Sequence, residues 1–207
     1  MNKFIYLLLI TLGLTGCSGL LTSNQNIDQF YTVNALPDYY DVKTGESHEY
    51  IDTTMIIQTA SVSKGLDGNK IILMHSPQRV DYYANARWSS QLSTMVQTSL
   101  IESFENSDVL DRVGSDFSSM HPEYALMLEI QDFQAEYQEE ASPPTIHIKL
   151  VGKLVQYPEH ALMASFTVET YKQAEENEVA DIVRAFDEAF AGAQALLIEE
   201  TLDYFAQ

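Results

Sequence analysis

The sequence predicts an α+β fold in which two amphipathic helices pack on one face of a mainly antiparallel sheet. Segments 126–137, 145–155 and 162–171 follow one another and alternate apolar with polar residues, as half-buried strands do. Segments 88–106 and 178–205 carry apolar residues at the spacing of an amphipathic helix. The sequence shows no internal repeat, and a single domain over residues 28–207 accounts for all of these elements.

The first part of this domain is expected to contribute short strands. Phe30–Val33 is aromatic and β-branched and stops before Leu36-Pro37. A polar loop over 38–50 follows. Three further extended segments are then predicted, at 51–62, 71–74 and 79–83. A turn at 64–69 separates the first from the second.

The first helix is predicted over Trp88–Asn106. Its apolar stripe comprises Trp88, Leu92, Met95, Val96, Leu100 and Phe104. A short strand at 109–113 is expected after it.

Three long strands come next and should form an antiparallel meander, because the connections between them are short. In the first strand, Leu126, Leu128 and Ile130 share a face, but the apolar positions shift by one residue near Asp132. A β-bulge produces such a shift. The residues expected to face inward in the other two strands are Ile146, Ile148, Leu150 and Leu154, and then Leu162, Ala164, Phe166 and Val168.

The closing helix is predicted over Glu178–Phe205. A wide apolar stripe supports it, made of Val179, Ile182, Val183, Phe186, Phe190, Ala193, Leu196 and Leu197.

The N-terminus has the pattern of a secretory leader that ends at the chain's single cysteine. Lys3 precedes an apolar run of 11 residues, which is short of the roughly 20 that span a bilayer. Leu14-Thr15-Gly16-Cys17 is similar to a bacterial lipobox. We therefore predict that residues 1–16 are a signal peptide and that Cys17 is lipidated, with acyl chains such as palmitate. The alternative is an ordinary leader beside a buried free cysteine.

Residues 17–27 would then form the lipidated cysteine and a short polar tether. Several acyl chains would hold the protein firmly on a membrane, whereas a single chain binds reversibly. Position 18 is Ser, whereas lipoproteins kept at the inner membrane commonly have Asp there. We therefore expect the periplasmic face of the outer membrane.

The chain is strongly acidic, with 11 Lys and Arg against 30 Asp and Glu and a net charge of −19. This balance argues against nucleic-acid binding, which needs basic patches to neutralise phosphates. It also argues against a broad electrostatic attraction to anionic lipid. A solvated acidic surface explains the charge.

No catalytic or metal-binding motif is present. The five histidines form no H-x-x-x-H or H-E-x-x-H pattern, and the chain has no G-x-S-x-G, P-loop or G-x-G-x-x-G. Two acidic clusters lack EF-hand spacing and are expected to be solvated loops rather than calcium sites: Glu136, Glu139 and Glu140, and Glu175, Glu176 and Glu178. We expect no catalytic residue, no metal and no cofactor.

The densest aromatic group comprises Tyr82, Tyr83 and Trp88. These side chains are candidates for contact with a partner protein or with lipid, because Tyr and Trp are enriched in binding hot spots. Packing at a strand–helix junction is the alternative, and it is favoured for Trp88 because this residue begins an apolar stripe.

Two segments carry a resemblance to a known family: Asp28–Pro37, with its Phe30-Tyr31-Thr32-Val33 strand, and Arg79–Trp88, whose Trp leads to Leu92 and Val96. The chain resembles the ABC-type transport auxiliary lipoproteins, the PqiC (YmbA)-like group. The usual Trp-Ala/Ser-Glu/Asp-Pro-Leu opening of that family's helix is Trp88-Ser89-Ser90-Gln91-Leu92 here.

The resemblance implies a non-enzymatic accessory of an MCE-type system that moves lipid across the envelope. The partner would be an MCE-domain protein, served by a permease and an ATPase, and a homo-oligomer is compatible with this role. A second hypothesis is a lipid carrier whose acyl-chain cavity is lined by residues such as Phe166, Phe186 and Phe190. A third is an envelope hydrolase, which would need a catalytic dyad that the sequence does not show.

Overall fold

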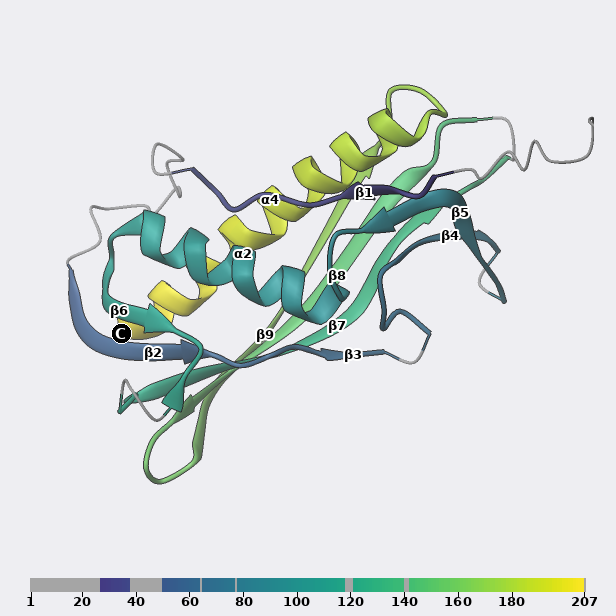
Figure 1. Ribbon diagram of the computed structural model, residues 1–207. Coiled ribbons are helices and arrows are strands. Elements are labelled where there is room, and N and C mark those ends of the chain that lie inside the picture. Colours follow the sequence, from purple (N-terminus) through teal and green to yellow (C-terminus); the bar gives the residue numbers. More distant parts are fainter. Residues whose placement is uncertain are drawn as a thin grey trace, which may run out of the picture.

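The computed structural model describes residues 27–37, 50–63, 65–76, 78–117, 121–139 and 142–206. The predicted signal peptide, Cys17, nearly all of the tether, most of the 38–50 loop and Glu140 lie outside this range. The described residues form a nine-stranded sheet with two long helices (Figure 1). The α+β class is confirmed. No helix in these residues is both long and apolar enough to cross a membrane.

The strands are β1 (Gln29–Tyr31), β2 (Ile51–Ile57), β3 (Ser61–Val62), β4 (Lys70–Ser76), β5 (Arg79–Trp88), β6 (Leu110–Gly114), β7 (Tyr124–Glu136), β8 (Thr145–Gln156) and β9 (Ala161–Gln173). The helices are α2 (Leu92–Ser107) and α4 (Val179–Phe205).

The predicted antiparallel meander is present as β7, β8 and β9. The register between β7 and β8 shifts between Ile130 and Asp132, which confirms the predicted β-bulge. Its effect is to keep Phe133 and Ala135 buried in the core, as Ile130 is before it. The residues of β8 that were expected to face inward are all fully buried.

The prediction of a mainly antiparallel sheet is confirmed only in part, because the sheet is mixed: the β4–β5, β7–β8 and β8–β9 pairs are antiparallel, and the other pairs are parallel. The second edge of β7 pairs in parallel with β2 and β3 along its first half and with β4 along its last residues. The β1–β5 and β2–β6 pairs are also parallel. Alternation within a strand indicates which of its faces is buried, but not whether the neighbouring strand runs parallel or antiparallel to it. The parallel pairs could therefore not be predicted from this pattern.

The predicted strand over 51–62 is interrupted. It divides into β2 and β3 with residues 58–60 between them. Met55, Ile56 and Ile57 are all buried, so β2 is covered on both faces rather than on one.

The first helix begins four residues later than predicted. Trp88 is the last residue of β5, pairs with Tyr31 and donates its backbone N–H to the Asn69 carbonyl at 2.7 Å. Its side chain nevertheless enters the core, which explains why it matched the helical stripe. The helix proper starts at Leu92 and is followed by Asp108 in the left-handed region, with φ of 51°.

One residue of β9 faces the opposite way from the prediction. Leu162 is 60% exposed, whereas Val168 is buried. The β8–β9 register shifts between Leu154 and Val155, so that Ala164 pairs with Leu154 but Leu162 pairs with Val155. This irregularity turns Leu162 to the outer face of the sheet.

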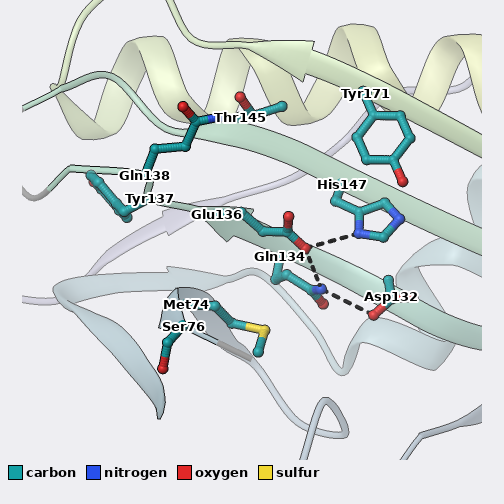
Figure 2. A pocket seen from close by; sticks show the side chains of 10 residues that line it. All are labelled: Met74, Ser76, Asp132, Gln134, Glu136, Tyr137, Gln138, Thr145, His147 and Tyr171. Carbon is teal, nitrogen blue, oxygen red and sulfur yellow. Dashed lines mark hydrogen bonds and ion pairs between the residues drawn. The ribbon is translucent and has the colours of Figure 1, made fainter. Parts of the chain in front are cut away.

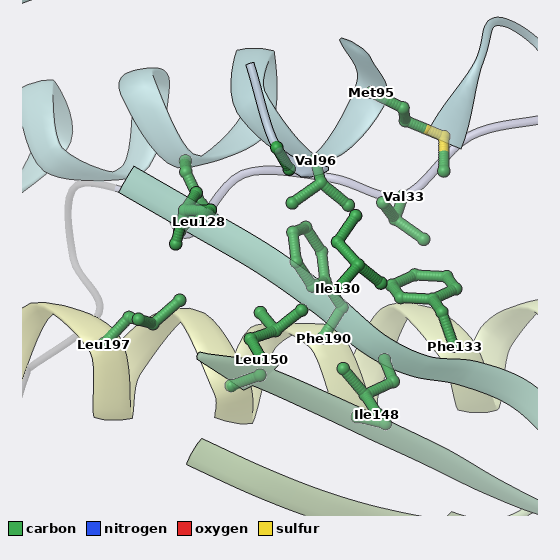
Figure 3. Packing of buried hydrophobic residues seen from close by; sticks show 14 of the residues in the cluster. Val33, Met95, Val96, Leu128, Ile130, Phe133, Ile148, Leu150, Phe190 and Leu197 are labelled. Atoms are coloured by element: carbon green, nitrogen blue, oxygen red, sulfur yellow. The ribbon is translucent and has the colours of Figure 1, made fainter. Parts of the chain in front are cut away.

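Helix α4 matches its prediction, with Glu178 preceding its first turn. Its apolar stripe, that of α2 and the inner faces of β7 and β8 belong to one buried cluster (Figure 3). The two helices therefore cover the same face of the sheet, and they touch through a hydrogen bond from Ser103 of α2 to Gln194 of α4. Leu196 was predicted in the α4 stripe but is 39% exposed and lies outside this buried cluster.

The segment after β1, residues 32–36, is held by side chains of both helices rather than by another strand. From α4, Asp187 accepts the Asn34 backbone N–H at 2.7 Å, and Gln194 Nε2 donates to the Asn34 carbonyl at 2.9 Å. Leu36 N–H donates to Ser103 of α2 at 2.9 Å. We call residues 32–36 the strap. It fixes the start of the domain, and hence the end of the tether, to the helical layer.

Candidate functional site

A hollow of about 520 Å³ lies on the outer face of the sheet, opposite the helices (Figure 2). Strands β4, β7, β8 and β9 and the residues that follow β7 contribute its walls. Its lining is Met74, Ser76, Asp132, Gln134, Glu136, Tyr137, Gln138, Thr145, His147 and Tyr171. A concave site with convergent polar groups is the usual form of a ligand site, so this hollow is the candidate site.

The bulge in β7 determines which side chains reach the hollow. Beyond the shift at Ile130/Asp132, the apolar residues Phe133 and Ala135 stay in the core, and Asp132, Gln134 and Glu136 take the outer face. Without the extra residue, the two sets would exchange faces.

Gln134 joins the two carboxylates of this strand. It is 3% exposed, and its Nε2 donates to Asp132 Oδ1 and to Glu136 Oε1, both at 3.0 Å. Its Oε1 accepts the Phe133 N–H at 3.1 Å. The buried amide is therefore satisfied and fixes the spacing of the acidic side chains.

His147 of β8 lies between carboxylates of both neighbouring strands. Its Nδ1 is 2.9 Å from Glu136 Oε1 of β7, and its Nε2 is 2.8 Å from Glu169 Oε1 of β9. A neutral imidazole has a single N–H, so the ring donates to both carboxylates only when it is doubly protonated. The Tyr171 ring stacks on this imidazole, with centroids 4.4 Å apart.

The protonation of these groups follows from the same contacts. Burial of the ring lowers the pKa of His147, but the hydrogen bonds to Glu136 and Glu169 outweigh it and leave the pKa above 6.5. The hydrogen bond from His147, with that from the Tyr171 hydroxyl, lowers the pKa of Glu169 below 4.5. The bond to Glu169 raises the pKa of Tyr171.

We expect the His147 contacts to make stability pH-dependent. Because its pKa is raised on folding, the contribution is complete below about pH 6.5 and is lost as the pH rises through the folded-state value. The lowered pKa of Glu169 affects stability on the acid side of the pH range. Its contribution to stability is present above about pH 4.5 and is lost as the carboxylate becomes protonated at lower pH. Urea unfolding from about pH 5 to about pH 9 should show stability declining on the alkaline side.

His147→Gln should flatten that alkaline decline, and His75→Gln, which leaves the His147 contacts intact, should keep it. If the two variants have the same pH profile as each other, His147 is not the titrating group.

Both ring nitrogens of His147 have carboxylate partners, so this imidazole has no free nitrogen to act as a base. The hollow offers carboxylate, amide and hydroxyl groups that can form hydrogen bonds to a ligand. Among the described residues, no group of three His, Cys, Asp or Glu side chains is placed to hold a metal ion.

The three aromatic residues predicted as contacts lie in different environments. Trp88 is 1% exposed and makes edge-to-face contacts with Phe133 and Phe186. Tyr83 is half-buried, with its hydroxyl 2.9 Å from that of Tyr137, and its burial raises its pKa. Tyr82 keeps 41% of its surface exposed and lies under the Lys70 ammonium, 4.1 Å from the ring centroid. Only Tyr82 of the three is well placed to meet another molecule.

Sequence reasoning missed the His147 cluster. The signal was available in the hairpin register, because Gln134 pairs with His147 and His147 with Tyr171. The acidic group predicted at 136–140 is divided by the fold: Glu136 belongs to the hollow, Glu139 does not line it and Glu140 lies outside the described residues.

Comparison with known proteins gives a family match. A family model described as an ABC-type transport auxiliary lipoprotein component matches residues 42–195. An uncharacterized protein of Bradyrhizobium diazoefficiens is 30% identical over 120 residues, which are 58% of this chain and 32% of that protein. The matched stretch thus spans about a third of the length of this relative.

Solved structures share the fold. A Xanthomonas campestris protein of the DUF330 family superposes with a TM-score of 0.73 at 21% identity, over 86% of this chain and 98% of that one. A hypothetical protein of Chlamydia trachomatis gives a TM-score of 0.51 at 7% identity, over 74% of this chain and 98% of that one.

Proposed function

We propose that this chain, which belongs to the ABC-type transport auxiliary lipoprotein family, is a non-enzymatic accessory of an MCE-type system that moves lipid between membranes. In this role it is anchored by acyl chains at Cys17 to the periplasmic face of the outer membrane and works by contact with an MCE-domain protein. The family match over residues 42–195 is the observation that carries the proposal.

Packing favours contact over carriage of lipid inside the domain. A carrier would need an apolar cavity near Phe166, Phe186 and Phe190. Phe186 and Phe190 are fully buried, and both rings pack on Phe133 with centroids 5.4 and 5.8 Å away (Figure 3 shows Phe133 and Phe190). In the described part of the chain, protein side chains fill this space.

Phe166 is also occupied by packing. Its ring lies on Gly152 of the neighbouring strand, where an added Cβ would come within 2.3 Å of ring carbon Cε2. Glycine at this position leaves room for the ring against the backbone.

The carboxylates of the outer face and the polar side chains around His147 are suited to recognition of a partner's polar surface. We place the contact with the MCE-domain protein on this part of the molecule.

The test is co-purification from the envelope. The native lipidated protein, solubilised in mild detergent, should bring down an MCE-domain protein in a fixed ratio. Variants Asp132→Asn and Glu136→Gln should weaken this binding, and Asp203→Asn, on the exposed side of α4, should not.

The same preparation tests the carrier alternative. Organic extraction of the mature chain made without its acyl anchor should release no stoichiometric phospholipid. Bound phospholipid together with no MCE-domain protein would overturn the proposed accessory role.

A further inference from the structure

A strip of five side chains lies on the outer face of β1, β5 and β4, which form one edge of the sheet. The members are Phe30, Lys70, Val80, Tyr82 and Arg87, and we call them the tether-side strip. Paired residues of neighbouring strands point to the same face, and the register pairs Phe30 with Arg87 and Arg87 with Lys70.

The strip continues along the hairpin through a register shift: Lys70 and Ile72 are two positions apart on β4, whereas their partners Arg87 and Tyr82 are five apart on β5, so the irregularity keeps both partners on the outer face. Tyr82 pairs with Ile72 and Val80 with Met74, and Met74 reaches the outer hollow. Ala86 and Trp88, on either side of Arg87, are buried in the core, which confirms that Arg87 points outward. All five residues therefore share one surface.

This surface is apolar, aromatic and cationic on a chain whose net charge is −19. Phe30 is 63%, Val80 49% and Tyr82 41% exposed. Lys70 lies over the Tyr82 ring, and Arg87 is bound to Asp28 at 2.6 Å. Exposed aromatic rings beside Lys and Arg are the combination that settles at a membrane interface, with rings among the headgroups and cations at the phosphates.

The path of the chain brings this strip to a membrane. Ile27, the first described residue, is 84% exposed and comes two residues before β1. Residues 18–26 separate it from Cys17, and these nine residues reach about 30 Å when fully extended. In Figure 1 the chain enters β1 beside the bend of β5, whereas the β8–β9 turn lies at the opposite end of the molecule.

We propose that the tether-side strip rests on the bilayer that receives the acyl chains of Cys17, with Tyr82 and Val80 at the headgroup level and Lys70 and Arg87 facing anionic phosphates. This inference rests on the proposed lipid anchor. Asp28 pairs with Arg87 at the strip itself, but the acidic residues around the outer hollow lie on other strands, β7 and β9, so their repulsion from anionic lipid would favour the same tilt. The net charge of the whole chain, −19, does not describe this part of the surface.

The experiment places a tryptophan on the strip and measures its contact with lipid. Lipidated protein carrying Tyr82→Trp or Val80→Trp is reconstituted into vesicles of phosphatidylethanolamine and phosphatidylglycerol, with or without lipids brominated close to the headgroup. Leu162→Trp is the control, since Leu162 is an apolar residue near the β8–β9 turn that is even more exposed than Val80 or Tyr82. The native Trp88 is buried and gives a constant background.

Bromolipid should quench the added emission about twofold at positions 80 and 82, because interfacial side chains lie within about 5–10 Å of the acyl boundary. It should leave position 162 unchanged. Quenching at neither strip position, or equal quenching at 162, overturns the proposal and leaves a protein as the occupant of the strip.

Failure of the anchor is detected separately. Intact-mass measurement of each preparation reports whether Cys17 carries acyl chains. A parallel arm attaches the mature chain to nickel-chelating lipids through an N-terminal hexahistidine tag, so the strip is tested whether or not Cys17 is acylated.

Discussion

Trp88→Ala should lower the free energy of unfolding by about 3–5 kcal/mol, the usual cost of removing a buried aromatic side chain. Trp88 is 1% exposed and links β5 to β7 and α4 through its contacts with Phe133 and Phe186, at centroid distances of 5.8 and 5.2 Å. No neighbouring side chain can fill the space of an indole without leaving its own place. Urea unfolding followed by far-ultraviolet circular dichroism measures the loss.

The control is Tyr82→Ala, which should cost less than about 1 kcal/mol because it removes a partly exposed ring and one cation–π contact. The comparison also separates the two interpretations of Trp88. If it were a docking residue, its removal would weaken partner binding and leave stability near the wild-type value, and that outcome would contradict the structural assignment.

Gln194→Leu should cost about 2–4 kcal/mol, because it leaves buried polar groups without partners. Gln194 is fully buried, and its side chain bonds to Asn34 O at 2.9 Å, to Leu36 N at 3.2 Å and to the Ser103 hydroxyl. The substitution should release the strap before the rest of the domain unfolds. Hydrogen exchange at the Leu36 amide is the sharpest measurement, and this amide should lose most of its protection.

Glu200→Gln, at an exposed position of the same helix, should change stability by less than about 0.5 kcal/mol and leave exchange at Leu36 unchanged. Wild-type protection of Leu36 in Gln194→Leu would show that the strap is held by something other than this network.

Much of the sheet follows from local pattern. The shift of apolar positions at Asp132 predicts the β-bulge, and the alternation of β8 predicts the four buried side chains from Ile146 to Leu154. The apolar stripe of α4 predicts its length almost to the residue. In each case the information lies within one segment and the side chains of that segment are buried on one face.

The predictions from sequence fail where the local structure depends on residues that are far away in the sequence. The parallel partners of β7 come from far earlier in the chain: Met55 pairs with Tyr124, 69 positions away, and Leu73 with Ala135, 62 positions away. Nothing within β2 or β4 specifies that direction. Trp88 fits a helical stripe and a strand end equally well, and its pairing with Tyr31 decides for the strand. Leu162 follows the alternation of β9 until an irregularity near the turn reverses its face.

The candidate hollow depends on several of these distant relations at once. His147 meets Glu136 because the bulge turns Glu136 outward, and it meets Glu169 because β9 returns in register beside β8. No motif spacing could indicate this, since the partners are 11 and 22 residues away in sequence. The exposed Tyr82 was predicted as a contact, whereas its neighbours on the strip, Phe30 and Lys70, become adjacent only through strand pairing.

The strap and the tether-side strip both lie close to the point where the tether joins the domain. The tether leads into β1, β1 is paired with β5, and the strap is bound to both helices. Acyl chains at Cys17 would therefore hold the domain at one edge of its sheet, with the β8–β9 turn directed away from that edge (Figure 1).

The intact mass of the native protein, extracted from envelope membranes, tests the proposed role most directly. We predict a chain that starts at Cys17, carries a diacylglyceryl group and an additional acyl chain, and fractionates with the outer membrane. A protein that retains residues 1–16, or that begins at Cys17 with an unmodified thiol, would contradict the account.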